Sequence, residues 1–369
     1  MHNAIIKNHR GTCSITYCNV DQSIEKIKNL SPDLLIIDKD LYSINKELVK
    51  QFLFIDKKIK LLPGEKTKTL NGVVSLLDQI VNLNIYPLNH VLVIGGATIQ
   101  DTCATALALL KRGTKWTYIP TTLLAQADSC IGSKTSINSH NTKNLYGVFY
   151  SPQRIFIISE FLKSLPEIEV LSGIGDAMHY LLLDIDLNSK YILDLINDIT
   201  ENGIDKYIKN SQKILKLSST VHSIKKHFIE VDEFDQSERK VLNLGHSFGH
   251  ALEAFFEYKL PHGVAVLYGL VLAIEISINL FKYDNKGHYI NSLKTIADKI
   301  LEMLSNYSPI ENKIIFNSIK NEKERYLNFL SRDKKNTKSN SFKLILFKSN
   351  KPRLVDCNKN LMIKFLENI

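Results

Sequence analysis

The chain has 369 residues, of which 44% are hydrophobic and 23% are charged. This composition excludes a disordered chain and suffices for one large or two medium globular domains. The formal net charge of +9 comes from lysines and arginines scattered along the sequence, often beside asparagine. Because no basic run carries the aromatic side chains that stack on bases, we expect no nucleic-acid partner, while phosphate-bearing small molecules suit the charge.

The chain start and the cysteines bear on the compartment. The first ten residues, MHNAIIKNHR, lack the apolar core of a signal peptide, and no apolar run is expected to span a membrane. Five cysteines form an odd set without C-x-x-C spacing, which argues against a disulfide framework and against a cysteine-zinc site. We therefore expect a cytoplasmic protein with no membrane partner.

Strand-like and helix-like patterns alternate over the first part of the chain. Helical periodicity covers Thr67–Leu83 and Gln100–Leu110. Short apolar runs that predict buried strands lie at Leu34–Asp38, Lys58–Leu62, Val91–Gly95, Lys115–Pro120 and Arg154–Ile158. This alternation predicts an α/β fold, a Rossmann-like parallel sheet with crossover helices, over residues 1–158.

The pattern from Ser159 onward is almost entirely helical. It predicts a second, α-helical domain over residues 159–369. Near its end, the polar tract Asp333–Ser341 predicts a loop, and the FKLILF run that follows can form a strand.

A glycine-rich turn follows the predicted strand Val91–Gly95. Gly95 and Gly96 precede a predicted helix, where a pyrophosphate can approach backbone N–H groups at the positive helix end. The segment is not G-x-G-x-x-G, so a simple turn is the alternative. Asp38, at the end of an earlier strand, can hold a ribose hydroxyl or can be an ordinary loop carboxylate.

A long polar segment, Pro120–Asn144, lies between two predicted strands. It concentrates hydroxyl side chains with Asp128, Lys134 and Lys143. A polar segment that must be ordered between strands indicates ligand contact, and a solvated loop is the alternative.

Three histidines indicate a metal site. His246 and His250 are four residues apart in a helical pattern, and Arg239 and Asn243 extend the same expected helical face. His262 follows an aromatic stretch and a proline, where a loop is expected to return it to the other two. Neutral imidazole is a common ligand of zinc-like ions. The alternative is that these histidines are unconnected polar residues.

Asp176 and His179 are three residues apart at an expected helix start, so they share a face. Asp176 can complete a three-ligand metal set with His246 and His262 and leave a position open for a substrate oxygen. Alternatively, Asp176 is a first-turn acid that the helix dipole favours.

In order and spacing, these motifs resemble 3-dehydroquinate synthase and the related sugar-phosphate cyclases. The resemblance runs from PGEKTKTL at Pro63 to DKK at Lys335. It includes GG…D, PTTLLA, D…GxKTxIN followed by KN, SG, and R…NxGHSxGHAxE followed by HG. The resemblance implies a Rossmann-like NAD domain followed by an α-helical metal domain, a homodimer, and NAD with a divalent metal, zinc or cobalt, as cofactors.

Site residues are implied by matching the motifs position by position. NAD contacts fall on Asp38, Glu65, Lys68, Gly95, Gly96, Asp101, Thr121, Thr122 and Lys143. The metal ligands fall on Asp176, His246 and His262. Substrate-handling residues fall on Asp128, Lys134, Asn144, His179, Lys225, Arg239, Asn243, His250 and a lysine of the DKK segment. Arg112 is implied to reach the phosphate site of the neighbouring subunit.

The chain departs from the family pattern at several of these motifs. Ala97 stands in place of a third glycine, Gln100 in place of a glycine, and Ser133 in place of the second glycine of GGKT. Asp176 replaces a ligand glutamate, and His179 replaces a substrate-handling lysine. Because aspartate is one methylene shorter, the metal or the helix must shift by about a bond length, and His179 becomes a candidate fourth ligand.

The activity that the resemblance implies is phosphate elimination with ring closure, catalysed with bound NAD. The leading substrate is 3-deoxy-arabino-heptulosonate 7-phosphate, a seven-carbon sugar acid phosphate, because Lys225 and Arg239 favour a carboxylate. This reaction belongs to the shikimate pathway. The alternatives are a cyclase acting on another sugar phosphate such as sedoheptulose 7-phosphate, a metal-dependent polyol dehydrogenase, and a homologue that binds nucleotide without catalysis.

Overall fold

The computed structural model describes residues 2–85, 87–140, 142–332 and 341–369. The chain forms two compact units, each built from two segments. Unit 1 comprises Met1–Leu165 and Ile208–Phe234, and unit 2 comprises Pro166–Tyr207 and Asp235–Ile369. A single boundary at residue 158 therefore does not describe the chain: the first junction falls at residue 165, and the chain later returns to unit 1.

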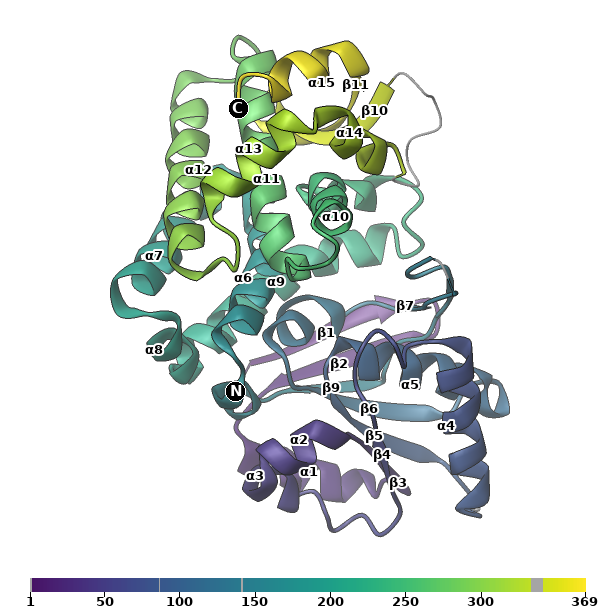
Figure 1. The fold of residues 1–369 in the computed structure, drawn as a ribbon. Helices are drawn as coiled ribbons and strands as arrows, with labels where there is room; N and C mark the ends of the chain where they lie inside the picture. Colours follow the sequence, from purple (N-terminus) through teal and green to yellow (C-terminus); the bar gives the residue numbers. More distant parts are fainter. Residues whose placement is uncertain (1, 86, 141, 333–340) are drawn as a thin grey trace. The chain divides into compact units, whose positions relative to one another are not determined.

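Unit 1 contains a seven-stranded sheet in the order β1-β2-β9-β6-β5-β3-β4, which can be followed in Figure 1. Only the β1–β2 pair is antiparallel among the strand pairs of this sheet. The strands of the unit are β1 (His2–Asn8), β2 (Gly11–Tyr17), β3 (Leu34–Asp38), β4 (Lys58–Leu61), β5 (His90–Gly95), β6 (Lys115–Pro120), β7 (Lys134–Ile137), β8 (Tyr146–Phe149) and β9 (Arg154–Ile157). Its helices are α1 (Val20–Leu30), α2 (Lys39–Ile44), α3 (Lys46–Lys50), α4 (Leu70–Asn82), α5 (Ala97–Leu109), η1 (Leu110–Arg112), η2 (Ala125–Ser129), η3 (Ser159–Ser164) and α9 (Ser211–Val231).

Both faces of this sheet are covered. In β3, Leu34 and Ile36 join one hydrophobic cluster, whereas Leu35 and Ile37 join another, and all four side chains are fully buried. A strand buried on both faces needs a continuous apolar run rather than an alternating one, which is why LLIID folds as an inner parallel strand. The predicted α/β class with a Rossmann-like parallel sheet is confirmed.

The five predicted strands are present as β3, β4, β5, β6 and β9. The predicted helices are α4, which begins three residues later than expected, and α5, which begins three residues earlier. The hairpin of β1 and β2, in which Asn8 pairs with Gly11 across a two-residue turn, was not predicted from the sequence. Gly11 has φ 124°, a backbone conformation that favours glycine at such turns.

Helix α9 lies in unit 1 although its sequence follows the first helices of unit 2. His222 of this helix is buried, and its Nδ1 atom forms a hydrogen bond of 2.8 Å with the Tyr17 hydroxyl of β2. Burial lowers the pKa of His222 to about 3, so the ring is neutral at physiological pH. Ile229 of the same helix joins the hydrophobic cluster of the sheet, which fixes α9 against unit 1.

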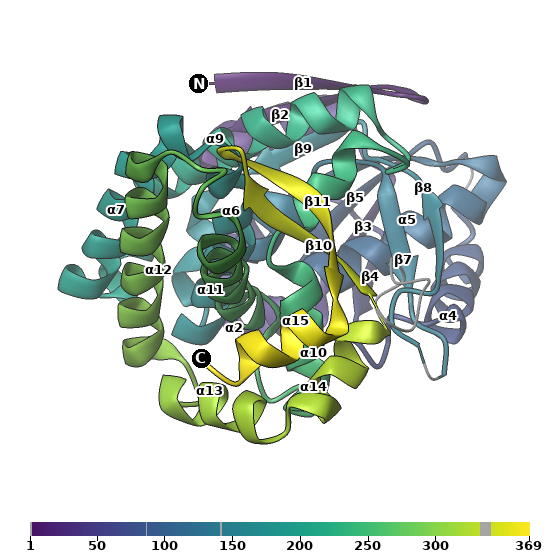
Figure 2. The ribbon, with the colours of Figure 1, turned by 90° about the horizontal axis from the view of Figure 1, so that it is seen from above.

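Unit 2 is mainly helical, as predicted, and ends with a β-hairpin. Its elements are α6 (Glu167–Leu181), η4 (Leu182–Asp184), α7 (Ile185–Asn202), η5 (Glu238–Asn243), α10 (His246–Phe255), α11 (His262–Phe281), α12 (Gly287–Tyr307), α13 (Asn312–Asn321), α14 (Lys323–Ser331), β10 (Ser341–Lys348), β11 (Lys351–Asn358) and α15 (Lys359–Leu366). The short helix α8 (Ile204–Lys209) contains a junction between the units. Figure 2 shows α11 among α6, α10 and α12, with which it packs.

Helix α11 is long and apolar enough to cross a membrane by length and composition, with a mean hydropathy of 2.1. The expectation that no apolar run reaches that length is therefore wrong for this segment. In the structure, 72% of the apolar stretch of this helix is buried inside the protein. A helix that is apolar on all sides is the pattern of a central core helix, which is the position that α11 occupies in unit 2.

Two glycines let α6 and α11 approach at the level of their backbones. A Cβ atom at Gly263 would lie 1.7 Å from the carbonyl oxygen of Ser172, and one at Gly175 would lie 2.0 Å from the carbonyl oxygen of Gly263. The Gly263 N–H also donates to the Ser172 hydroxyl at 3.0 Å. These glycines are the chain neighbours of Asp176 and His262, so the close contact fixes the distance between those two side chains.

We predict that Gly263→Ala destabilises unit 2 by about 1–3 kcal/mol or more, because the added methyl group forces α6 away from α11. The matched control is Gly287→Ala at the start of α12, where an added Cβ has no atom within 4 Å. Urea unfolding followed by circular dichroism measures the effect. Equal unfolding midpoints for the two variants would contradict the role of this contact.

Candidate functional site

Asp176 lies in the second half of α6, and only 2% of it is exposed. The prediction that it stands at a helix start is wrong, because α6 begins at Glu167 directly after Pro166. A proline at this place suits a helix beginning, since its missing N–H would have no partner within the helix. Asp176 is therefore not a first-turn acid, and the helix dipole does not account for its burial.

The structure brings Asp176, His246 and His262 together. His246 is the first residue of α10 and His262 the first residue of α11. The Oδ1 atom of Asp176 lies 3.4 Å from Nε2 of His262 and 3.8 Å from Nε2 of His246. The loop between α10 and α11 returns the chain so that His262 faces the other two residues, as the sequence predicted.

Hydrogen bonds at the far side of each ring orient the two imidazoles. Nδ1 of His246 lies 3.3 Å from the carbonyl oxygen of Leu244, and Nδ1 of His262 lies 3.0 Å from Oε2 of Glu253. Because these oxygens only accept, Nδ1 is the donor in each bond, which turns Nε2 of each ring toward Asp176. Burial, together with the neighbouring histidines, lowers the pKa of His246 well below its usual value, so its ring is neutral.

This donor set fits a divalent metal ion. Tetrahedral zinc has bonds of about 2.0–2.2 Å, which separates ligand atoms by about 3.4 Å. The distances of 3.4 and 3.8 Å from Asp176 Oδ1 match that separation after small side-chain rotations. One carboxylate and two imidazoles suit zinc or cobalt and leave a coordination position open. The role of the three residues as ligands remains a prediction.

The predicted helical spacing of His246 and His250 is confirmed in α10, where their ring centroids lie 5.7 Å apart. His250 is exposed and its ring stacks with that of His262 at 5.4 Å. The expectation that Arg239 and Asn243 extend the same helical face is wrong. Both lie in the separate 3-10 helix η5. Gly245, with φ 78°, breaks the helical conformation between η5 and α10.

Glu253 is the hydrogen-bond partner of His262 and was not predicted from the sequence. Glu253 is 8% exposed and lies in α10, seven residues after His246, so both project from one side of the helix. That spacing was a usable signal, because a carboxylate two turns from a metal-binding histidine is placed to hold a second ligand. The contact itself depends on the loop that returns His262.

In unit 1, predicted NAD contacts lie at the carboxyl ends of two neighbouring strands of the sheet. From β3 the chain proceeds outward to β4, and from β5 it proceeds the other way to β6, so the winding direction changes between β3 and β5. Ligands of doubly wound sheets bind at the carboxyl ends of the strands at such a point. Asp38 ends β3, and Gly95 ends β5.

The Gly95–Gly96 turn is closely packed. A Cβ atom at Gly95 would lie 2.7 Å from the side chain of Ile99, and one at Gly96 would lie 3.0 Å from that of Thr122. Thr121, 3% exposed, donates its N–H to the carbonyl oxygen of Gly95 at 3.1 Å. Packing therefore disfavours a side chain at Gly95 whichever ligand the turn holds, and it leaves little room for one at Gly96. Gly96 precedes α5 and caps it without a side chain.

The departures in this motif have structural explanations. Ala97 is the first residue of α5 and is half-buried, so its methyl group fits within the turn. Gln100 donates to the carbonyl oxygen of Ser129 at 2.7 Å and accepts from the Ser129 hydroxyl at 2.8 Å. The larger side chain thus links α5 to the last residue of η2.

Acidic and basic residues near this turn pair with one another. Lys68 is 5% exposed, and its Nζ lies 2.7 Å from Asp101 Oδ2 and 3.9 Å from Glu65 Oε1. Burial raises the pKa of Asp101, while the ammonium group of Lys68 acts in the opposite direction. Asp38 caps α2 by accepting from the N–H groups of Asp40 and Leu41 through Oδ1. These four predicted NAD contacts stay predictions.

Much of the polar segment Pro120–Asn144 has regular structure among its described residues. It contains the π-helical turn η2 and strand β7, and its residue Asp128 binds a buried lysine of α9. Nζ of Lys225, 5% exposed, donates to the backbone oxygen of Asp128 at 2.7 Å and to its Oδ1 at 2.8 Å. The solvated-loop alternative is wrong for this part of the segment.

Most of the remaining predicted contacts of unit 1 are exposed, whereas Thr122 is half-buried. Lys134 starts β7, Lys143 and Asn144 precede β8, and Arg112 ends the short helix η1. Asn144 has φ 54° and accepts a hydrogen bond from the Ser136 hydroxyl at 2.9 Å. Thr122 accepts from the N–H of Ala125 at 3.2 Å, which begins the turn before η2. The DKK lysines lie outside the described residues.

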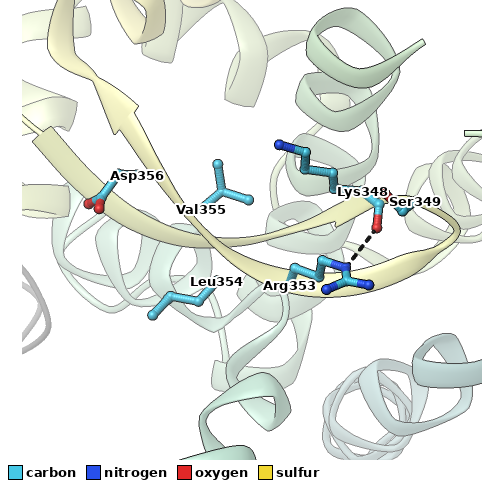
Figure 3. Close-up of a pocket in the computed structure, with 6 residues that line it drawn as sticks. All are labelled: Lys348, Ser349, Arg353, Leu354, Val355 and Asp356. Carbon is cyan, nitrogen blue, oxygen red and sulfur yellow. Dashed lines mark hydrogen bonds between the residues drawn. The ribbon is translucent and has the colours of Figure 1, made fainter. Parts of the chain in front are cut away.

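An open hollow of about 470 Å³ lies on the β10–β11 hairpin and contains no predicted site residue. Arg353 donates from Nε to the carbonyl oxygen of Lys348 at 3.3 Å (Figure 3). The hollow is lined by Lys348, Ser349, Arg353, Leu354, Val355 and Asp356.

Comparison with known proteins places the chain. It matches the families described as 3-dehydroquinate synthase N-terminal, over residues 58–172, and 3-dehydroquinate synthase C-terminal, over residues 187–336. The 3-dehydroquinate synthase of Clostridium tetani is 30% identical over 347 residues, which cover 93% of this chain and 87% of that protein. That of Pelagibacter ubique is 35% identical over 336 residues, covering 85% and 82%.

A solved structure of 2-deoxy-scyllo-inosose synthase, complexed with carbaglucose-6-phosphate, NAD⁺ and Co²⁺, shares the fold. Its TM-score is 0.82 at 21% identity, and the match covers 100% of this chain and 99% of that chain. The fold and the matches define an enzyme with a Rossmann-like part and a helical part. The chain belongs to the 3-dehydroquinate synthase family of cyclases. The resemblance read from the sequence is confirmed.

We predict that Glu253→Gln lowers the affinity for Zn²⁺ about 10-fold or more, because a neutral amide orients His262 less firmly than a carboxylate does. The control is Glu257→Gln, a carboxylate with a 72% exposed side chain beside Lys259. Competition with a chromophoric chelator measures both affinities. An unchanged affinity in Glu253→Gln would show that this hydrogen bond does not support metal binding.

Proposed function

We propose that this protein is a 3-dehydroquinate synthase that converts 3-deoxy-arabino-heptulosonate 7-phosphate to a carbocycle with elimination of phosphate. The observation that carries the proposal is the convergence of Asp176 Oδ1 with His262 Nε2 at 3.4 Å and His246 Nε2 at 3.8 Å. It is supported by membership of the family and by the strand-end edge of the sheet that carries Asp38, Gly95 and Gly96.

The proposed cofactors are NAD and zinc or cobalt. Bound NAD supplies a hydride acceptor that is regenerated within each cycle, and the divalent ion supplies a Lewis acid for an alcohol oxygen. Asp176, His246 and His262 hold the ion. In unit 1, Lys68 and Asp101 are held as an ion pair beside the helix that follows the glycine turn, where they can orient the nucleotide.

The proposed substrate carries both a carboxylate and a phosphate. Arg239, 6% exposed, presents a guanidinium group that binds a carboxylate bidentately. Phosphate-binding roles are proposed for Lys134, Asn144 and His250, all of which are exposed to solvent. Asn243 and Asp128 are proposed to position the substrate hydroxyl groups.

One observation favours the alternative of a substrate without a carboxylate. Lys225 does not need a substrate carboxylate as its partner, because its Nζ lies 2.8 Å from Asp128 Oδ1. A related cyclase that acts on sedoheptulose 7-phosphate is therefore the second candidate. A metal-dependent polyol dehydrogenase is distinguished from both by release of NADH.

The proposed assembly is a cytoplasmic homodimer without nucleic-acid or membrane partners. Two features of Arg112 support a contact between subunits. Its side chain is exposed, and its backbone and that of Lys111 have positive φ angles of 62° and 51°. Such backbone is maintained only where the surrounding structure requires it. We propose that Arg112 reaches the phosphate site of the neighbouring subunit.

We predict that the protein with NAD and Zn²⁺ or Co²⁺ releases phosphate from 3-deoxy-arabino-heptulosonate 7-phosphate and forms a carbocyclic product. The assay is run side by side with sedoheptulose 7-phosphate, with phosphate release, NADH absorbance and product mass as readouts. Turnover of sedoheptulose 7-phosphate alone would establish the second candidate, and accumulation of NADH without phosphate release would establish a dehydrogenase.

We also predict that Ala97→Asp weakens NAD binding about 10-fold or more while the protein stays folded. A carboxylate in the first turn of α5 is favoured by the helix dipole but repels a pyrophosphate at the same place. The isosteric control is Ala97→Asn, which lacks the charge. Calorimetric titration with NAD in the presence of Zn²⁺ compares the variants. Equal affinities would place the pyrophosphate away from the start of α5.

A further inference from the structure

We propose that His179 is a direct fourth protein ligand of the metal ion. The site would then hold the ion through one carboxylate and three imidazoles, from Asp176, His179, His246 and His262, and a substrate oxygen would enter as a fifth ligand. This inference rests on the proposed function, because it concerns the ion that Asp176, His246 and His262 are proposed to hold.

The first observation is the position of His179 on the same helix turn as Asp176. The two residues are three apart in α6, so their side chains leave the same face of the helix. Both are 2% exposed. A carboxylate and an imidazole that leave one helix face in a buried region can both serve as ligands of a single divalent ion.

The second observation is the distance between possible ligand atoms. Asp176, His179 and His246 each offer an atom, and these atoms lie within 4.8 Å of one another. The rings of His179 and His246 have centroids 4.6 Å apart and are perpendicular, at 90°. Two rings at this separation and angle do not stack on each other, and the pair is compatible with a shared ion.

The third observation connects the two departures of this chain from the family pattern. Aspartate in place of glutamate shortens the carboxylate arm by one methylene, which draws an ion toward α6. Histidine in place of lysine puts a ligand three residues further along the same helix, where a protonated lysine could not bind a cation. Together, the two changes place a carboxylate and an imidazole three residues apart in α6, where both can face one ion.

A buried histidine can also serve only in packing or as a proton carrier. His179 packs against the ring of Tyr180, with centroids 3.9 Å apart, which is what a packing role requires. A packing or proton-transfer role leaves the coordination number of the ion unchanged when His179 is replaced. Direct ligation does not, so the spectroscopy of the bound ion separates the roles without any measurement of activity.

The test uses the full chain loaded with Co²⁺ or Zn²⁺, as the wild type and as His179→Gln and His179→Lys. The control is His288→Gln, a histidine of unit 2 whose side chain is 67% exposed. We expect both His179 variants to lose at least about 10–100-fold in metal affinity, the range seen even for residues that only support a ligand. We also expect their Co²⁺ visible spectra to change, whereas His288→Gln matches the wild type.

X-ray absorption of the zinc-loaded wild type gives an answer that requires no variant to fold. Three imidazole ligands support the proposal, and two overturn it. Unchanged affinity and an unchanged Co²⁺ spectrum in His179→Gln would also overturn it while leaving the three-ligand site intact. If the wild type binds neither ion, the proposed metal site fails together with this inference.

Discussion

The backbone contact between α6 and α11 is the constraint on which the candidate metal site depends. Gly175 and Gly263 leave no room for a methyl group, since an added Cβ would lie 2.0 Å or less from a backbone oxygen. Asp176 and His262 follow and precede these glycines in sequence, so the distance between their side chains is set by two helix axes rather than by flexible loops. A site held by packed helices keeps its geometry before any ligand arrives.

The two units handle buried charge in different ways. In unit 1, the buried ammonium groups of Lys68 and Lys225 lie within 2.8 Å of the carboxylates of Asp101 and Asp128. In unit 2, the buried carboxylate of Asp176 lies beside the imidazole rings of His246 and His262, and burial keeps the His246 ring neutral. Neutral rings supply lone pairs rather than countercharge, and a dication at this place would offset the carboxylate.

Several departures from the family pattern follow from their surroundings in the structure. Gln100, which stands where the family has a glycine, forms two side-chain hydrogen bonds with Ser129. The Ser133 hydroxyl donates to Glu233, which also binds the backbone N–H of His9 in the β1–β2 turn. Such substitutions add local contacts within unit 1. Those at Asp176 and His179 instead change the chemistry of the donor set itself.

The sequence by itself determined the inner strands, because LLIID and VLVIG must be buried on both faces, and it determined which residue types could bind a metal. It also indicated that His246 and His250 share a helix face. Only the tertiary structure decided that α6 begins at Glu167, that Gly245 separates Arg239 and Asn243 from α10, and that Glu253 holds His262. Local patterns fix what a residue can do within its own element. Contacts between distant elements depend on packing, which no single stretch of sequence encodes.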